Sequence, residues 1–328
     1  MNNNNLNDCP DFLKEFLFYI QTIKGRSERT VDGYYIDLRL FFRFIKSTKQ
    51  LNHDFSNFDK IKIQDLPISI LSQITRPDIY AFLNYTLSTR ENKANSRSRK
   101  ISSVRSFFKY ITTKTSYLSE NPAIDIDLPT AKKSIPKYLS LEESLSLLSS
   151  IQGDFVERNY CIITLFLNCG MRLSELVGIN HSDIKENTIR LLGKGNKERI
   201  IYLNDACVNA ITQYQDYKIQ LYLKTKPKDE KALFLTTRGT RISARRIQQI
   251  VEECLQYANL SGQGYSPHKL RHTAATLMYQ HGNVDIRILK EILGHQDIST
   301  TEIYTHMSSK QMEQAADSSP LANIKIKK

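Results

Sequence analysis

Helical periodicity dominates the first part of the chain. Apolar residues recur every three to four positions, as on the buried face of a helix, over residues 11–24, 31–45 and 96–112. A further helix start is indicated by Thr75, with Asp78 three positions later and Pro77 between them, because this spacing fits a capping box. These patterns predict a bundle of four short helices.

The periodicity stops at a stretch in which prolines recur. From about Ser119 to Lys137 no helical pattern continues, and the stretch contains Pro122, Pro129 and Pro136. Such a segment is typical of an extended linker. A chain of 328 residues is long enough for two separate cores. We therefore expect a helical domain over residues 1–118, a linker over 119–137 and a second domain over 138–328.

The second domain is expected to mix helices with one pair of strands. Ser266 fits the N-cap of a helix that has Pro267 in its first turn. Residues 187–203 alternate apolar and polar side chains around a turn in which two glycines flank Lys194, and this pattern predicts a hairpin. The predicted fold class is mainly α with a small β-hairpin or sheet, as a helical domain followed by an α+β domain.

Positive charge favours a polyanionic partner. Lys and Arg number 46 against 34 Asp and Glu, and the formal net charge is +12. Eight basic residues and one acid lie between Arg90 and Lys114, although a solvated helix face would look the same. We also expect DNA contacts near the start of a helix predicted from Ser243 to Tyr257. The candidate DNA-binding residues are Arg97, Arg99, Lys100, Arg105, Arg241, Arg245 and Arg246.

Cysteine usage and hydropathy indicate the compartment. The five cysteines are odd in number and lack the short paired spacing of zinc or redox sites, so reduced and mostly buried thiols are expected. No apolar run approaches eighteen residues, and the N-terminus lacks a signal-peptide pattern. We expect a cytoplasmic protein with no membrane partner and no metal.

A set of cationic and nucleophilic residues in the second domain can cleave a DNA phosphodiester. Two arginines can hold the non-bridging oxygens of one phosphate, a lysine can protonate a leaving oxygen, and a tyrosine hydroxyl can attack phosphorus. A histidine at a helix start can act as the base. The candidate catalytic residues are Arg172, Lys194, His268, Arg271, His295 and Tyr304, with Glu175 placed to orient Arg172.

Taken singly, each of these residues has a simpler interpretation. Arg172 and Glu175 are three apart and could form an ordinary intrahelical ion pair. Lys194 could be a solubilising turn lysine, and Tyr304 could pack against the core. The occurrence of all of them in one chain is what favours a catalytic role in cleaving a phosphodiester.

Five short segments, in order along the chain, resemble the tyrosine recombinase (phage integrase) family. The resemblance covers about residues 10–320 and is strongest to the short bacterial Xer-type recombinases, which consist of a helical core-binding domain and a catalytic domain. The segments are GMRLSEL around Arg172, GKGNKER around Lys194, HKLRH around His268 and Arg271, LGH around His295, and EIYTH around Tyr304.

The resemblance implies a reaction and a role for each residue. Tyr304 attacks the scissile phosphate, forms a 3′-phosphotyrosyl bond and releases a 5′-hydroxyl that later attacks the partner strand. No cofactor or ATP takes part, because the bond energy is conserved. Arg172 and Arg271 stabilise the phosphorane and Lys194 protonates the 5′-oxygen. The other implied roles are a base (His268), a phosphate donor (His295) and a residue that positions Arg172 (Glu175).

The resemblance also implies an assembly on DNA. In this family four protomers bind two double-stranded recombination sites and pass through a Holliday junction. We expect either a homotetramer or a heterotetramer with a paralogous recombinase, and the segment after Tyr304 resembles a tail that inserts into a neighbour. Whether a DNA translocase activates the enzyme stays open.

The sequence admits four biological interpretations. Xer-like chromosome dimer resolution is favoured over integration, excision or inversion by a mobile element, because many element integrases carry an extra N-terminal domain and this chain starts almost directly on the core-binding helices. A type IB topoisomerase would act as a monomer, which the tail argues against. A non-catalytic DNA-binding regulator would be expected to have lost a catalytic residue, and none is missing.

Overall fold

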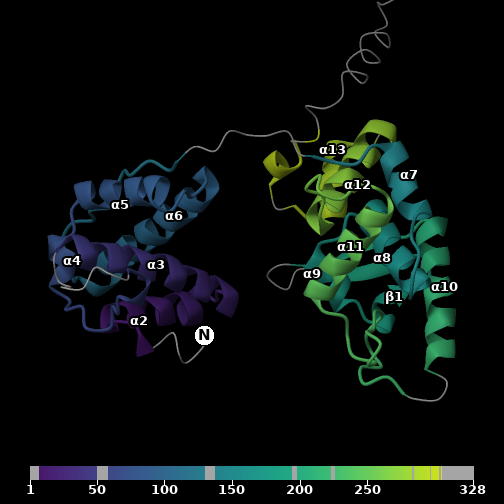
Figure 1. Cartoon of the computed structure of the whole chain (residues 1–328), viewed down its shortest axis with the longest axis horizontal. Helices are drawn as coiled ribbons and strands as arrows, with labels where there is room; N and C mark the ends of the chain where they lie inside the picture. Colours follow the sequence, from purple (N-terminus) through teal and green to yellow (C-terminus); the bar gives the residue numbers. More distant parts are fainter. Residues whose placement is uncertain are drawn as a thin grey trace, which may run out of the picture. The chain divides into compact units, whose positions relative to one another are not determined.

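The chain folds into two compact units, Met1–Lys133 and Ser134–Lys328 (Figure 1). The computed structural model describes residues 7–49, 58–129, 137–193, 198–222, 226–282, 284–295, 297–302 and 304. Lys194 and the C-terminal segment after Tyr304 therefore lie outside the described residues, as do residues 130–136 of the predicted linker.

The first unit is a helical bundle, as its periodicity predicts. Thr75 and Asp78 form the predicted capping box, in which the Thr75 backbone N–H donates to Asp78 Oδ2 at 2.8 Å. The helices are α2 (Asp11–Phe18), α3 (Glu28–Thr48), α4 (Ile70–Gln73), α5 (Arg76–Ser88) and α6 (Ala94–Tyr110). Short helical turns follow α2 (Tyr19–Ile23), precede α4 (Phe58–Lys60) and follow α6 (Ile111–Thr115).

Aromatic rings fill the core of this bundle. Phe12, Phe42 and Phe107 meet pairwise edge to face or tilted, with ring centroids 5.3 to 6.1 Å apart. Ala123 and Ile126 are also buried in this core. The expected linker of residues 119–137 therefore overlaps the packed part of the first unit, because two of its apolar residues find a place against the helices.

The second unit is mainly helical with one small sheet, which confirms the predicted fold class. The predicted hairpin forms as β2 (Thr188–Leu192) and β3 (Glu198–Tyr202), with Ile189 opposite Ile201. A short strand that the sequence pattern did not indicate, β1 (Ile184–Lys185), pairs antiparallel with β2 and completes the order β1-β2-β3.

Helix α8 (Val156–Cys169) forms the centre of the second unit. Ten of its 14 residues are buried, and it packs against α10 (Asp205–Leu221) and α12 (Pro267–His281) (Figure 1). The other helical elements are α7 (Leu141–Ser149), α9 (Leu173–Gly178), the turn His181–Asp183, α11 (Ala244–Tyr257), α13 (Ile286–Leu293) and the turn Ile298–Thr300.

All five cysteines are free and buried, as predicted. Burial raises the pKa of Cys9 and of Cys254 to about 12, so both are thiols at neutral pH. No helix within the described ranges is both long and apolar enough to cross a membrane.

Candidate active site

Arg172 lies at the start of α9, where its local sequence fixes both its backbone and its side chain. Gly170 ends α8 in the left-handed conformation (φ 56°), and a Cβ there would lie 2.9 Å from a methyl group of Leu293. Arg172 is then the N-cap of α9. Glu175 accepts from the Arg172 backbone N–H at 2.7 Å and from Nη1 at 2.8 Å. The expected pairing of Arg172 with Glu175 is present.

Glu175 also binds a second arginine, which the sequence interpretation missed. Arg199 on β3 donates from Nη1 and Nη2 to the two carboxylate oxygens of Glu175, and the Glu175 side chain is only 1% exposed. Burial opposes ionisation of this carboxyl, but the hydrogen bonds from Arg199 and Arg172 outweigh burial and lower its pKa. Arg199 is the last residue of the GKGNKER segment and falls in a stretch of alternating polar and apolar residues, which was the only sequence signal for its inward direction.

Three arginines converge on the C-terminal end of α13. Arg199 Nε donates to the Ile292 carbonyl at 3.0 Å, Arg271 Nη2 to the Leu293 carbonyl at 2.5 Å, and Arg172 Nη2 to the Gly294 carbonyl at 2.8 Å. The last carbonyls of a helix lack intrahelical partners and form the negative end of its dipole. The end of α13 thus holds three guanidinium groups from α12, β3 and the start of α9 close together.

Arg271 is the most deeply placed of the three. Its residue is 2% exposed, and its second hydrogen bond goes from Nη1 to the Gly170 carbonyl at 2.7 Å. Burial, followed by the like charge of Arg172, lowers its pKa to about 10. The guanidinium therefore remains charged at neutral pH. The structure brings Arg172 and Arg271 together as the sequence predicted.

Two histidines and a tyrosine form a chain of hydrogen bonds beside these arginines. His268 and His272 are four residues apart on α12, so they share one helix face, and their Nε2 atoms are 3.1 Å apart. His272 Nδ1 lies 2.7 Å from the Tyr304 hydroxyl. The Tyr304 residue is 1% exposed and its ring packs in a small cluster with Ala275, Leu289 and Leu293.

The protonation states of this chain follow from burial. Burial lowers the pKa of His272 to about 4, with a further contribution from His268, and burial raises the pKa of Tyr304 to about 12. The pKa of His268 is also lowered by burial and by the charge of Arg271. At neutral pH Tyr304 is a phenol and His272 a neutral imidazole. Sequence reasoning named His268 and missed His272, although the four-residue spacing was visible.

His295 lies just past the end of α13, where the left-handed Gly294 (φ 63°) turns the chain. Its Nδ1 atom is 2.9 Å from the Thr301 hydroxyl. Burial and the charges of Arg271 and Arg172 lower its pKa to about 4, so it is neutral at pH 7. The interactions with both arginines place His295 in the same electrostatic environment, as expected of a member of this set.

The assembled cluster is suited to hold an anion next to a nucleophile. Two guanidinium groups pair with the Glu175 carboxylate, and the third, of Arg271, donates to backbone carbonyls instead. The Arg172 side chain is 33% exposed, so part of the positive charge can reach a ligand. Within the described ranges, no group of three or more His, Cys, Asp and Glu side chains is placed to hold a metal ion.

The arginines predicted to contact DNA on α11 and before it have different surroundings. Arg241 donates to the Val177 and Ile179 carbonyls at 3.0 and 3.2 Å and pairs with Asp229 at 3.0 Å, so it anchors loops. Arg245 is exposed and makes no hydrogen bond or ion pair with the part of the chain that the structure describes.

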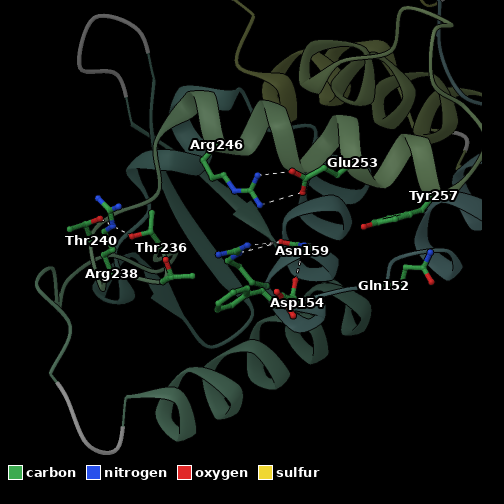
Figure 2. Close-up of a pocket in the computed structure, with 12 residues that line it drawn as sticks. Gln152, Asp154, Asn159, Thr236, Arg238, Thr240, Arg246, Glu253 and Tyr257 are labelled. Atoms are coloured by element: carbon green, nitrogen blue, oxygen red, sulfur yellow. Dashed lines mark hydrogen bonds and ion pairs between the residues drawn. The ribbon is translucent and has the colours of Figure 1, made fainter.

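Arg246 faces a cavity away from the catalytic cluster. The cavity has a volume of about 610 Å³ and lies between α8, the 236–240 turn and α11. Figure 2 shows Arg246 paired with Glu253 of the same helix, with Asn159 below. The two charged groups are 2.7 Å apart. Its lining includes none of the predicted catalytic residues. Arg246 is therefore already engaged within the protein.

The basic residues of α6 also differ from one another. Arg99 pairs with Asp37, whose side chain is fully buried, and Arg105 donates to the Ile126 carbonyl at 3.3 Å. Lys100 lines a cavity of about 270 Å³ whose lining also includes Arg39, Arg43 and Arg90. Arg97 is half-buried. Their predicted role in DNA binding stays a prediction.

Known proteins resemble the chain over nearly its whole length. The Phage integrase family matches residues 137–311, and the phage integrase N-terminal SAM-like domain matches residues 60–115. Tyrosine recombinase XerC of Caldanaerobacter subterraneus subsp. tengcongensis is 48% identical over 317 residues, which are 95% of this chain and 88% of that protein. Tyrosine recombinase XerD of Rickettsia bellii is 31% identical over 95% of this chain and 99% of that protein.

Solved structures share the fold. A post-cleavage complex of the XerH site-specific recombinase with palindromic difH substrate has a TM-score of 0.70 at 22% identity, and covers 96% of this chain and 86% of that one. A lambda integrase (residues 75–356) dimer on a COC′ core site has a TM-score of 0.65 at 17% identity, and covers 88% of this chain and 95% of that one.

Proposed function

The chain belongs to the phage integrase family as a Xer-type tyrosine recombinase, and on that premise we propose that it cuts and rejoins DNA through a 3′-phosphotyrosyl bond to Tyr304. One observation carries the proposal. The Tyr304 hydroxyl is within hydrogen-bond distance of His272, which lies on the same helix as His268 and Arg271. Arg271 and Arg172 both donate hydrogen bonds to carbonyls at the end of α13. Nucleophile, proton acceptor and anion-binding cations thus occur in one small region.

The first chemical step is an in-line displacement. The Tyr304 oxygen forms a bond to phosphorus, and the bond from phosphorus to the 5′-oxygen breaks. The 5′-oxygen takes a proton from Lys194, and the tyrosine proton goes to the histidine pair. Because a phosphotyrosyl ester keeps the energy of the phosphodiester, a 5′-hydroxyl can later reverse the step without ATP.

The arginines stabilise the charge that develops during this step. Attack builds negative charge on the equatorial oxygens, and preorganised cationic donors lower such a barrier by several kcal/mol. Arg172 and Arg271 are held by helix-end carbonyls before DNA arrives, so little reorganisation is needed. Glu175 positions Arg172, and His295 adds a further donor to a phosphate oxygen.

We assign the first unit to DNA binding and the second to catalysis, with the boundary in the region of residues 119–137. The basic surface of α6 and the exposed Arg245 are suited to phosphate contacts. XerH was solved with a difH substrate and lambda integrase as a dimer on a core site. By analogy, the substrate is a double-stranded recombination site bound by several protomers, as a homotetramer or with a paralogous recombinase.

The biological task follows from the relatives. The relatives described above are named XerC and XerD and match nearly all of this chain. We assign the chain to resolution of chromosome dimers in the cytoplasm, with a DNA translocase as a partner that would activate it. Integration, excision or inversion of a mobile element uses the same chemistry and is the competing task.

A cleavage assay separates these tasks. Nicked suicide duplexes are prepared from the chromosome terminus of the host and from the ends of a neighbouring mobile element. Covalent adducts on the terminus duplex alone support dimer resolution, whereas adducts on the element ends alone support the mobile-element task. Adducts on neither duplex, with a folded protein that still binds DNA, contradict the catalytic proposal and support a DNA-binding regulator.

A further inference from the structure

His272 is in direct contact with the atom that the proposed function assigns as nucleophile. Its Nδ1 is 2.7 Å from the Tyr304 hydroxyl, and its Nε2 is 3.1 Å from His268 Nε2. The two imidazole rings cross nearly at right angles, with centroids 4.5 Å apart. His272 therefore lies between Tyr304 and the histidine that the sequence motif singles out.

We assign the directions of these hydrogen bonds from the chemistry of the groups. A buried phenol hydroxyl is a better donor than acceptor, so we assign its O–H as the donor to His272 Nδ1, which is then the unprotonated nitrogen. In a neutral imidazole the other nitrogen then carries the hydrogen. His272 Nε2–H consequently donates to His268 Nε2, which accepts. The chain of donors runs in one direction, from Tyr304 through His272 to His268.

The surroundings of Tyr304 offer its hydroxyl few hydrogen-bond partners. The residue is 1% exposed and its ring packs against Ala275 and Leu293. Within the described ranges, His272 is the hydrogen-bond partner of this hydroxyl. A base that acts on Tyr304 in this geometry acts through His272.

We propose that His272 is the residue that takes the proton from Tyr304 and relays a proton to His268. The inference deepens the proposed function and rests on it. As the Tyr304 oxygen bonds to phosphorus, its O–H bond breaks and an N–H bond forms at His272 Nδ1. At the same time the N–H at His272 Nε2 breaks and one forms at His268 Nε2. His272 stays neutral in its other tautomer, and His268 becomes the imidazolium.

Burial explains why the charge is passed on. His272 is half-buried, and burial lowers its pKa to about 4, so an imidazolium there is unfavourable. Burial and the charge of Arg271 also lower the pKa of His268, but this residue is exposed and therefore keeps more contact with solvent than His272. The relay therefore moves the positive charge from the buried ring to the more solvated one. When the 5′-hydroxyl attacks in the second step, the same bonds reverse.

The test uses the rate of adduct formation on a suicide duplex in a single turnover with saturating protein. His272→Gln keeps a side chain that can accept and donate but cannot relay a proton, so we expect cleavage to slow by about 100-fold. His281→Gln, on the exposed last turn of the same helix, is the matched control and should leave the rate unchanged.

A fluorinated tyrosine at position 304 distinguishes proton removal from a structural role. Its hydroxyl is more acidic, so it depends less on a base. We expect the loss caused by His272→Gln to shrink from about 100-fold with tyrosine to less than about tenfold with difluorotyrosine. An Arg172→Lys variant, which lacks phosphate stabilisation instead, should gain no such relief.

The outcomes separate the relay from the proposed function. Equal losses with both tyrosines, or no loss with His272→Gln, would overturn the relay while wild-type adducts uphold the recombinase. Faster cleavage by His272→Gln would also overturn the relay, and would show that His272 holds Tyr304 in an inactive position. Nitrogen-15 spectra of the wild-type imidazoles give a check that needs no variant. They should show His272 protonated at Nε2, and protonation at Nδ1 would overturn the relay.

Discussion

Arg172 and Arg199 donate to the same buried carboxylate, that of Glu175, one from the start of a helix and the other from a strand. Each arginine also donates to a carbonyl at the end of α13. Strand β3 is thereby tied to the end of α13, directly before His295. Glu175 is thus a shared support for the catalytic residues rather than one half of a simple ion pair.

Removing the charge of Glu175 should destabilise the protein. We expect Glu175→Gln to lower the free energy of unfolding by about 3 kcal/mol, because two arginines lose their buried counter-charge. Urea unfolding measures the change. Glu198→Gln, on β3 next to Arg199, removes an exposed partner of Arg190 on β2 and should leave the unfolding midpoint unchanged. An equal, small effect of both variants would show that Glu175 has no such role.

The same carboxylate should contribute to the acid dependence of stability. Its pKa in the folded protein lies below the ordinary value of 4.5, so its contribution is complete above that value and is lost as pH falls through the folded pKa. We expect the free energy of unfolding of the wild type to fall more steeply below about pH 4.5 than that of Glu175→Gln. Parallel curves for the two proteins would contradict this assignment.

The half-buried histidines should make stability depend on pH in a higher range than Glu175 does. His272 and His295 have pKa values of about 4 when folded, against an ordinary value of 6.5. Between these values the unfolded chain binds protons that the folded chain does not, so stability is lost as pH falls from 6.5 towards 4. Thermal unfolding from pH 7 to pH 5 should show a shallower decline for a His272→Gln, His295→Gln double variant. An equally steep loss of stability in the double variant and the wild type would contradict this assignment.

Arg241 and Arg245 should separate stability from DNA affinity. Arg245→Ala removes an exposed cation, so we expect about tenfold weaker DNA binding, a salt slope reduced by about one, and an unchanged unfolding midpoint. Arg241→Ala removes a loop anchor and should instead lower the free energy of unfolding by about 2 kcal/mol. Fluorescence anisotropy at several salt concentrations, with urea unfolding, measures both. The reverse pattern would assign Arg241 to the DNA surface.

Arg99 should stabilise the first unit through Asp37. Arg99→Ala leaves a fully buried carboxylate without its cation, so we expect a loss of about 2 kcal/mol in the free energy of unfolding. Adding Asp37→Asn should recover part of that loss, since a neutral amide tolerates burial better. A double-mutant cycle in urea measures the coupling. Strictly additive effects would mean that the pair does not couple.

Local sequence rules predicted several element boundaries. The N-cap of α12 at Ser266 and the capping box at Thr75 each depend on side chains within a few residues. Such short-range chemistry is visible in a sequence. Strand β1 is only two residues long, and its pairing with β2 leaves no periodic pattern to detect.

The candidate site was only partly predictable, because some of its contacts join residues that are far apart in the sequence. Arg172, Arg271 and Tyr304 were identified by motif and do lie in one region of the second unit. Arg199 and the carbonyls at the end of α13 come together only through tertiary packing, which spacing does not encode. The same holds for Arg241, whose carbonyl partners lie elsewhere in the fold and leave it anchored rather than free.

The central claim is that Tyr304 forms a covalent bond to the 3′-phosphate of a cleaved DNA strand. The most direct measurement incubates wild type and Tyr304→Phe with a suicide duplex, digests the adduct with protease and nuclease, and locates the phosphorylated tyrosine by mass spectrometry. We predict that wild type alone gives an adduct, that its nucleotide is joined through a 3′-phosphate, and that the modified peptide contains Tyr304. An adduct on another residue, a 5′-linked nucleotide, or an equal adduct with Tyr304→Phe would contradict the account.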